Sequence, residues 1–599
     1  MKSPAEAMTP PLHGPELSLR PHARPHGVRL GAGLALCALA LCLGSSTKAR
    51  AGGLELLPGG TKSVARAGAV AARPSDPMAL QHNPAGLAWL SGRQLMANLD
   101  VPWNDLCVQP YGYYGWGVYE EADTRFGNTT ELELSADGEP VPGASYASDH
   151  LDRVCNSASV LPVPHLAIAA KLAPRLYFGA GLVGATMLVG LQWGGANGSI
   201  VTPDGPRPTP TRYQLVKQEV NFALNPTAGL AYRIRPDFSL GVALQILMAD
   251  VDTYAVQSLE AGTSPHNDVM GKLSARDYFV PALTLAAHAK PIPALDVMAA
   301  VRLVDDLDGS GEATFTTSAY NGGAERGLIP TENDPIDLER VKLGFPWTIT
   351  AGIRYAGRSE AQLLEGEPDA RDAMESELWD VELDLSLQLN ARASQTLFEF
   401  GQDVSLRFDN ADGTSEPSVT LREQDLERVG VDRHLRDAFV ARLGGSYSLI
   451  PKRLMAHAGV FYESSGVDPD YANIDAFAFQ RFGAGLGVAL RFGAFDLIAA
   501  YGRIQQPRVV VAPRDHQLVQ DSGGDPRSGF DQRVGGIGST DSGVVFSDPA
   551  VPGQGQQDGQ AAYQQIAPVS TDNRPRAVVN AGEYTGAFDI VSLGVVYRL

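Results

Sequence analysis

The chain has 599 residues, a formal net charge of -20 from 48 Lys and Arg against 68 Asp and Glu, and 44% hydrophobic residues. This balance argues against a nucleic-acid-binding protein, because binding to phosphates requires clustered cations. Gly (64) and Pro (41) are abundant, which predicts a long folded chain with many turns. Four cysteines are too few for a disulfide-dense scaffold or a multi-cysteine metal framework, so neither a metal nor a cofactor is expected.

Residues 1–51 have the order of a secretory signal peptide. Arginines at positions 20, 24 and 29 precede the apolar run Leu30–Leu43, and the small-residue site Ala49–Ala51 follows it. A membrane anchor is the alternative, but an apolar run of about 14 residues is shorter than the roughly 20 that span a bilayer as a helix. Cleavage before Gly52 would also remove the cysteines at positions 37 and 42.

Cys107 and Cys155 are therefore the two cysteines of the expected mature chain, residues 52–599. An even pair in an exported protein suggests one disulfide, and closing a loop of this size would stabilise the fold by roughly 4 kcal/mol. Two free thiols are the alternative.

Alternation with a period of two, rather than helical periodicity, runs through the mature chain. From Trp379 to Asn390, apolar residues occupy one face and polar residues the other, which predicts a strand with two different faces. The pattern recurs and predicts about fourteen strands, near 94–101, 165–173, 176–189, 213–234, 238–254, 278–290, 295–303, 343–355, 378–394, 438–450, 454–463, 482–492, 495–510 and 587–599. After the signal, no run of 18 or more apolar residues occurs, so a helical membrane protein is excluded.

The linkers between these strands alternate between short and long. Tight turns lie near positions 174, 236, 292, 452 and 493, and long polar linkers cover 102–164, 190–212, 255–277, 304–342, 395–437, 464–481 and 511–586. Short turns on one rim and long loops on the other are typical of an outer-membrane barrel, whereas a soluble sandwich would share only the alternation. We therefore expect an all-β, transmembrane antiparallel β-barrel. Residues 356–377 break the rule, because they are long and acidic where a short turn is expected.

Aromatic residues near the strand ends are expected to form a girdle at the membrane interface. They are Trp347, Tyr355, Trp379, Phe492, Phe495 and Tyr597. Core packing of each one is the alternative.

Motifs that suggest catalysis or metal binding do not fit their context. Gly179–Gly184 matches G-x-G-x-x-G, but it lies inside a predicted strand with no helix after it. Asp305–Glu312 is similar to a calcium loop, but Val304 stands at the first ligand position. His434 is a lone loop histidine, and neither H-E-x-x-H nor G-x-S-x-G occurs. No catalytic residue and no enzyme activity are therefore expected.

Residues 52–93 precede the first predicted strand and carry a family resemblance. They contain the small-residue stretch Gly59–Ala69, followed by Ser75–Leu87 with its Asn-Pro-Ala motif. These residues resemble the start of the FadL/TodX family of outer-membrane transporters for long-chain fatty acids and hydrophobic compounds. Further similarities lie at Pro164–Ala169, at Tyr232–Ile234 with the strand that follows, and from Asp437–Phe439 through Val460–Tyr462.

The resemblance implies three parts: a signal peptide (1–51), an N-terminal hatch or plug (52–93) and a fourteen-stranded barrel with long extracellular loops (94–599). It also implies that Asn83, Pro84 and Ala85 hold the hatch against the barrel wall. A simple Asn-Pro turn is the alternative.

Two further sets of residues follow from the implied mechanism. Substrate is expected to leave sideways through a kink in the third strand, at Gly179, Gly181 and Gly184, for which small-residue packing is the alternative. Substrate is also expected to touch apolar side chains that point into the lumen, unless these pack against the hatch. They are Val183, Met187, Leu247, Phe461 and Ile498.

We therefore expect a non-enzymatic transporter of long-chain fatty acids or similar hydrophobic molecules in the outer membrane of a Gram-negative-type cell. Its expected partners are these molecules, outer-membrane lipid and the barrel assembly machinery, and not nucleic acid. Uptake of aromatic hydrocarbons is the nearest alternative, followed by a structural or adhesive barrel and by an outer-membrane hydrolase. The chain departs from the usual pattern by ending in Leu599 rather than an aromatic residue.

Overall fold

The computed structural model describes residues 57–72, 74–110, 152–184, 190–195, 198–202, 205–212, 214–258, 268–317, 327–329, 335–358, 372–401, 407–409, 428–467, 472, 474–475, 478–511 and 582–599. The expected signal peptide, Met187 and most of the linker 511–586 lie outside these residues. Within the described ranges, no helix has both the length and the apolar character that crossing a membrane requires.

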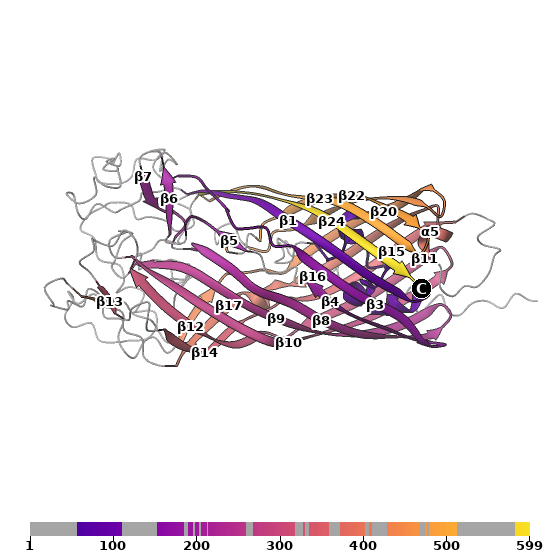
Figure 1. Cartoon of the computed structure of the whole chain (residues 1–599), viewed down its shortest axis with the longest axis horizontal. Helices are drawn as coiled ribbons and strands as arrows, with labels where there is room; N and C mark the ends of the chain where they lie inside the picture. Colours follow the sequence, from indigo (N-terminus) through magenta and orange to yellow (C-terminus); the bar gives the residue numbers. More distant parts are fainter. Residues whose placement is uncertain are drawn as a thin grey trace, which may run out of the picture.

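Fourteen antiparallel strands form a closed barrel (Figure 1). Each strand pairs with the next in the order β1 (Gln94–Pro110), β3 (Val163–Ala173), β4 (Leu176–Gly184), β8 (Lys217–Arg235), β9 (Phe238–Ser258), β10 (Asp268–Ile292), β11 (Leu295–Val304), β15 (Trp347–Gly357), β16 (Trp379–Leu389), β20 (Ala438–Ile450), β21 (Leu454–Glu463), β22 (Arg481–Phe492), β23 (Phe495–Val511) and β24 (Gly582–Arg598). The ring closes because β1 pairs with β24, from Gln94 opposite Arg598 to Pro110 opposite Gly582. The predicted fourteen-stranded barrel is confirmed.

The two faces of the strands are reversed relative to those of a soluble protein, with apolar side chains outside and polar side chains inside the barrel. On β16, the apolar side chains of Val381 and Leu383 are exposed, whereas the polar side chains that alternate with them are buried in the lumen. These buried residues are Asp380, Glu382, Asp384, Ser386 and Gln388. A wall that is apolar outside and polar inside suits a hydrocarbon surrounding, and the closed ring leaves no unpaired edge strand.

The ring has two different rims. At the turn rim, which carries the C-terminus in Figure 1, tight turns join β3 to β4, β8 to β9, β10 to β11, β20 to β21 and β22 to β23. The side chains of Tyr355 and Trp379 pack together there, as do those of Phe495 and Tyr597, with ring centroids 5.9 and 4.7 Å apart. Five of the six aromatic residues expected to form the girdle lie near this rim. Trp347 lies at the opposite end of its strand, β15. We call the opposite rim the loop rim.

Additional strands extend one side of the wall toward the loop rim. They are β12 (Leu307–Thr317), β14 (Ile336–Leu343), β17 (Gln395–Phe400) and β19 (Arg428–Asp432), with the 3-10 turn η4 (Asn390–Ala393) between β16 and β17. They pair in the order β10, β12, β14, β17, β19. The expectation that 304–342 and 395–437 are loops is therefore wrong in these parts. The two faces are reversed here relative to the membrane strands. Charged side chains lie on the outer face and form ion pairs, such as Arg340 with Asp308 and Lys342 with Asp306, while the apolar residues that alternate with them are buried.

The remaining short elements lie in the linkers. They are β2 (Val154–Cys155), β5 (Leu191–Gln192), the pair β6 (Ser199–Thr202) and β7 (Gly205–Pro208), the pair β13 (Gly327–Ile329) and β18 (Arg407–Asp409), and the helical turn α5 (Ala373–Ser376). Next to α5, Asp372 forms a 2.7 Å ion pair with Arg491, which holds the end of the acidic linker 356–377 to the turn rim. The stretch Asp305–Glu312, compared above with a calcium loop, leads into strand β12.

Residues 57–90 lie inside the ring, and we call them the N-terminal segment. They contain α2 (Thr61–Ala65), α3 (Ala79–His82) and η1 (Pro84–Trp89), and the described residues among them are almost all buried. Helix α2 contacts β1 and β21 to β24, whereas η1 contacts β4, β8, β9 and β10. A segment that touches such different arcs of a closed ring lies within its lumen. That this segment acts as a hatch stays a prediction.

Candidate functional site

A buried arginine ties the N-terminal segment to strand β16. The guanidinium of Arg66 donates to Asp380 Oδ1 and to Glu382 Oε2, each at 2.7 Å, and all three side chains are at most 7% exposed. Burial alone would lower the pKa of Arg66, but the carboxylates of Asp380 and Glu382 raise it above its ordinary value. The backbone N–H of Ala72 also donates to Glu382, and that of Ala71 donates to Asp384. The N-terminal segment thus binds to the inward polar face of β16.

The Asn-Pro-Ala motif forms a second anchor. The side-chain amide of Asn83 donates to the carbonyl of Ala71 at 2.9 Å and to Nδ1 of His288 at 3.2 Å. Its Oδ1 accepts the N–H of Gly86 at 3.1 Å and so caps η1. His288 then contacts Asp296 through Nε2, at 3.1 Å. Asn83 is therefore bonded both within the segment and to the wall, and its role in holding a hatch stays a prediction.

Glycines in the wall let the segment approach at backbone distance. A Cβ at Gly485 of β22 would lie 2.0 Å from the carbonyl oxygen of Val64. A Cβ at Gly241 of β9 would lie 2.1 Å from the backbone nitrogen of Ala85. Contacts this short exclude any side chain, so glycine at these strand positions serves close packing with the segment.

Four of the residues expected to line the lumen can be located, and they point inward into apolar clusters. Val183 and Ile498 belong to a buried cluster that includes Met78 of the segment. Phe461 belongs to another that includes Leu57 and Val64. Leu247 lies in a cluster of wall residues around Phe345. Contact of these side chains with substrate stays a prediction, as does any role of Met187, which lies outside the described residues.

Two small polar cavities lie along the segment. The one of about 80 Å³ faces the loop rim and is lined by residues that include Thr350, Arg302 and Arg442. The one of about 50 Å³ faces the turn rim and is lined by residues that include Arg66. His82 borders both cavities. Burial lowers the pKa of His82 to about 4, although Asp76 acts in the opposite direction.

The described ladder between β4 and β8 runs from Leu176 to Gly184, which lies opposite Leu224. A short ladder between β5 and β8 places Leu191 opposite Gln218. Residues 185–189, which join β4 to β5, lie outside the described residues, so a kink beyond Gly184 stays a prediction.

The expected kink glycines have different surroundings. A Cβ at Gly179 would meet Leu87 and Leu80 of the segment, whereas one at Gly181 would meet the backbone of Leu166 in β3. Pairing passes through both positions unbroken. Gly184 is the last residue of β4, and an exit of substrate at any of the three glycines stays a prediction.

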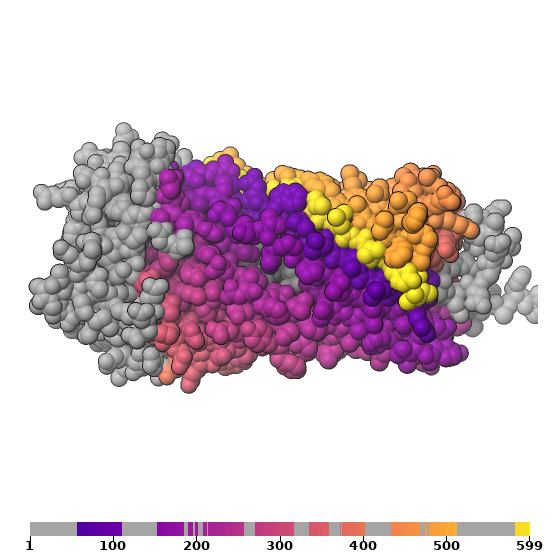
Figure 2. Space-filling model, in the orientation of Figure 1, coloured from indigo at the N-terminus to yellow at the C-terminus, as the bar shows by residue number. Residues whose placement is uncertain are grey.

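An apolar hollow with a volume of about 820 Å³ lies on the outer surface, over strands that include β1, β3, β4 and β8. Figure 2 shows the molecule from the side on which the first strands lie. The floor of the hollow is made of small residues such as Ala97, Ala180, Gly181 and Ala228, and its border of larger ones. The border includes Leu95, Leu166, Ile168, Leu182, Leu244, Phe495 and Tyr597. The volume lies in the range of pockets that hold one small ligand.

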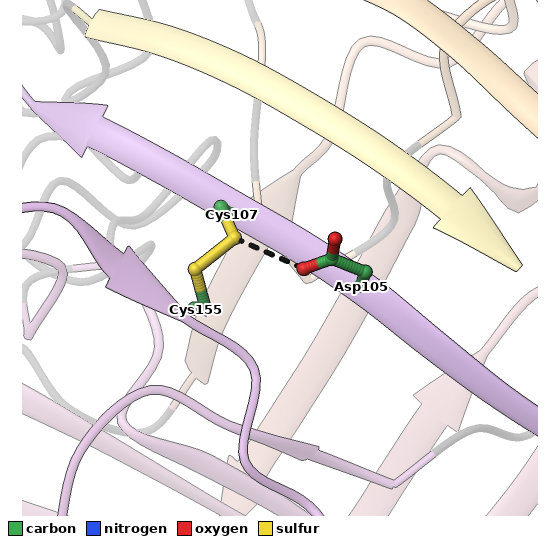
Figure 3. Close-up of side chains that lie close together, drawn as sticks. All are labelled: Asp105, Cys107 and Cys155. Atoms are coloured by element: carbon green, nitrogen blue, oxygen red, sulfur yellow. Dashed lines mark hydrogen bonds between the residues drawn. A yellow bond between two sulfur atoms is a disulfide. The ribbon is translucent and has the colours of Figure 1, made fainter.

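Cys107 and Cys155 form a disulfide between β1 and β2 (Figure 3). The two residues are also direct partners in the β1–β2 ladder, so Cys107 belongs to a strand rather than to the linker 102–164. Asp105 Oδ1 lies 3.3 Å from Cys107 Sγ. This group does not suit a metal ion, because both sulfurs are bonded to each other and no thiolate is left.

Comparison with solved structures matches this architecture. A FadL homologue from Pseudomonas aeruginosa aligns with a TM-score of 0.55 and 15% identity, over 90% of this chain and 98% of that one. The toluene transporter TodX from P. putida aligns with a TM-score of 0.51 and 12% identity, over 90% and 98%. The fold is that of the FadL-type barrels. No protein-family model and no curated protein matches the sequence.

Sequence reasoning missed three features of the FadL-type barrel described here. It quoted Arg66 only as part of a motif, and the alternation of β16 was the signal that its carboxylates point inward. Nothing in the sequence indicated Arg302 and Arg442 in the lumen, or the buried pair of Asp100 in β1 and His165 in β3, whose Oδ2 and Nε2 lie 3.1 Å apart.

Proposed function

We propose that the chain is an outer-membrane transporter that admits hydrophobic molecules from the loop rim and releases them sideways into the membrane. The observation that carries the proposal is the apolar hollow of about 820 Å³ on the outer surface over β1, β3, β4 and β8, while the N-terminal segment lies in the lumen. The loop rim then faces the medium and the turn rim faces the periplasm, as in other barrels of this kind.

The sideways route suits a hydrophobic cargo. The segment is bound by buried charged groups at Arg66 and by Asn83, so a passage along the barrel axis requires that these contacts break. A molecule leaving through the wall passes from one apolar surface to another. Transfer of each CH₂ group from water into lipid gains about 0.8 kcal/mol, and the sideways route keeps this gain.

Long-chain fatty acids fit the site better than aromatic hydrocarbons do. The cavity next to the segment places Arg302 and Arg442 near the hydroxyl of Thr350. Guanidinium groups form the strongest pairs with carboxylates, and toluene has no group that would use them. The cavity also contains Asp384, which accepts the N–H of Ala71. Aromatic hydrocarbon uptake remains the second candidate, because TodX, with the same fold, is named a toluene transporter.

The test is uptake of a labelled long-chain fatty acid by cells that lack their own transporter and express this chain. We expect wild type to restore uptake and Asn83→Ala to reduce it, with both proteins still migrating as heat-modifiable barrels. An assembled wild-type barrel that carries neither fatty acid nor toluene contradicts the proposal, and binding of its loops to a target surface would then support an adhesive barrel.

Two further variants test the exit route and the choice of substrate independently. Ala228→Trp fills the outer hollow without touching the lumen, and we expect it to reduce uptake at least severalfold. Val460→Trp is the matched control, since Val460 is an exposed apolar residue of β21 outside the hollow. Arg302→Gln is expected to reduce fatty-acid uptake and to leave toluene uptake unchanged. Equal effects of Arg302→Gln on both cargoes contradict carboxylate recognition.

A further inference from the structure

The end of the linker between β15 and β16 reaches well beyond these two strands. Residues 372–378, which we call the strap, contain the turn α5 and lie at the turn rim (Figure 1). Asp372 of the strap forms ion pairs of 2.7 Å with Arg491 of β22 and of 3.0 Å with Arg598 of β24. In the pairing order of the ring, β22 and β24 lie three and five strands beyond β16. The strap therefore spans a wide arc of the turn rim.

The strap turns into the barrel rather than away from it. The side chain of Met374 is 6% exposed and belongs to the buried cluster that includes Met78 of the N-terminal segment and Ile498. Met374 also borders the cavity of about 50 Å³, together with Ser63 of the segment. A cavity of this size holds only a few water molecules. The strap thus lies close against the segment.

A buried carboxylate fixes the other end of the strap. The side chain of Glu377 is 0% exposed and forms ion pairs with Arg354 of β15 and, at 3.4 Å, with Arg358. The backbone N–H of Leu378 donates to the carbonyl of Gly357, where β15 ends, at 2.9 Å. Breaking a buried ion pair on one side is strongly destabilising, so these contacts hold the strap firmly.

Asp372 also determines the shape of the strap. Its Oδ1 accepts the backbone N–H of Met374 at 2.9 Å, and its carbonyl oxygen accepts the hydroxyl of Ser376 at 2.8 Å. The carboxylate therefore caps α5 while it binds the two arginines of the wall. Loss of this one charge removes both the cap and the attachment to β22 and β24.

The strap and helix α2 cover the same arc of the ring at different depths. Helix α2 packs against Gly485 of β22 and Gly594 of β24. On the same two strands, Arg491 and Arg598, which bind the strap, lie nearer the turn rim. The 3-10 helix η1 contacts the arc from β4 to β10 instead. On the arc from β22 to β24, two layers thus close the lumen one behind the other.

The two layers have different anchors. Helix α2 ends next to Arg66, which pairs with Asp380 and Glu382. Arg354 is shared, because it contacts both Asp380, at 3.1 Å, and the strap. Asp372 has partners of its own on β22 and β24. We therefore expect the strap to stay in place when the ion pairs of Arg66 are lost.

We propose that the strap is a second barrier, which closes the turn rim beneath α2 and keeps this side of the lumen shut to polar solutes when α2 leaves its place. The inference goes beyond the proposed transport function, because it concerns leakage of ions and polar solutes and not the passage of hydrophobic cargo. Barrels larger than about eight strands are not filled by the side chains of their own walls, so a fourteen-stranded barrel needs such layers to stay closed.

The test is the ionic conductance of the full chain, assembled and inserted in a planar lipid bilayer. Arg66→Met frees α2, and we expect it to stay as closed as wild type because the strap remains. Asp372→Asn/Glu377→Gln frees the strap, and we expect it to stay closed because α2 remains. The variant with all three substitutions should conduct roughly tenfold more than wild type, or better, since neither layer is left.

The same turn offers a matched control. Glu375 also contacts Arg491, at 3.3 Å, but its side chain is 63% exposed. Exposed ion pairs contribute little, so Glu375→Gln should leave the strap in place. Arg66→Met/Glu375→Gln is therefore expected to remain closed. Heat-modifiable migration checks that each variant has assembled, and Asp372→Asn alone replaces the strap variant if that one does not assemble.

Hydrogen–deuterium exchange of the amides of residues 374–378 checks that the strap has been freed. We expect exchange there to rise roughly tenfold or more in Asp372→Asn/Glu377→Gln and to stay unchanged in Arg66→Met. Unchanged exchange in the strap variant overturns the assignment of its anchors. Arg66→Met that conducts as much as the triple variant overturns the second barrier, as does an assembled triple variant that stays closed. Conductance needs no hydrophobic cargo, so the barrier and the transport function can fail independently.

Discussion

Loss of Arg66 is expected to release the N-terminal segment without opening the barrel. Arg66→Met keeps much of the side-chain volume but leaves Asp380 and Glu382 buried, at 3% and 1% side-chain exposure, without this cation. Asp380 retains Arg354 at 3.1 Å, so the larger cost falls on Glu382. Removing one partner of a buried ion pair costs about 3–5 kcal/mol.

This loss of binding free energy predicts faster hydrogen–deuterium exchange in the segment. At about 1.4 kcal/mol for each factor of ten, amides of residues 61–72 should exchange about a hundredfold to three-thousandfold faster in Arg66→Met than in wild type. The strand amides of β22 and β23 should keep their protection, because the ladders between them remain. Heat-modifiable migration checks that the barrel has assembled.

A second variant tests the cause. Arg66→Met/Glu382→Gln removes the unpaired anion, and the glutamine oxygen still accepts the N–H of Ala72. We expect it to recover most of the lost protection. A change below tenfold in the single variant, or no recovery in the double variant, would refute the argument that a buried ion pair fixes the segment.

Two further predictions concern the same segment. Gly241→Val should displace the Asn-Pro-Ala motif and reduce uptake. Gly271→Val is the control and should have little effect, because a Cβ there comes no closer than 3.3 Å to Phe315. Equal hydrogen–deuterium exchange of residues 83–89 in the two variants would contradict this prediction. The pKa of His82 is lowered on folding, from 6.5 to about 4, so its neutral form is favoured in the docked state. The free energy of docking the segment is therefore most favourable above pH 6.5 and becomes weaker by up to about 3 kcal/mol as the pH falls toward 4. Hydrogen–deuterium exchange of the segment at pH 7.5 and 5.0 would detect this loss. His82→Gln should abolish the dependence on pH.

The barrel itself could be predicted because its membrane strands have two chemically distinct faces. β16 shows this most clearly, since Val381 faces outward while Asp380 and Glu382 face the lumen, and the sequence alternates accordingly. The outer strands could not be predicted in the same way. In β12 and β14, charged residues such as Asp308 and Arg340 pair on the exposed face and the apolar face is buried. Glycines at positions 309 and 311 and a shift in register between them shorten the apolar pattern, so these strands are less apparent in the sequence.

The candidate site was predictable only where a local motif marks it. Asn83 was identified from the Asn-Pro-Ala motif, whereas Arg66 and Asp380 are separated by 314 positions and nothing in either neighbourhood indicates the pair. The same is true of Asp100 and His165, whose contact depends on the register of β1 with β3.

The pairing of β1 with β24 also constrains the order in which the molecule is built. Gln94 finds its partner Arg598 only when the end of the chain has been made, so the sheet stays open until then, and forming such distant contacts is slow because a long loop must first be closed. The N-terminal segment immediately precedes β1 and is present throughout. The glycine positions of β22 and β9 can therefore close around its backbone during assembly, and no finished rim has to admit it. A chain that stops before residue 582 would leave β1 and β23 as two unpaired edges, which invite pairing with other chains.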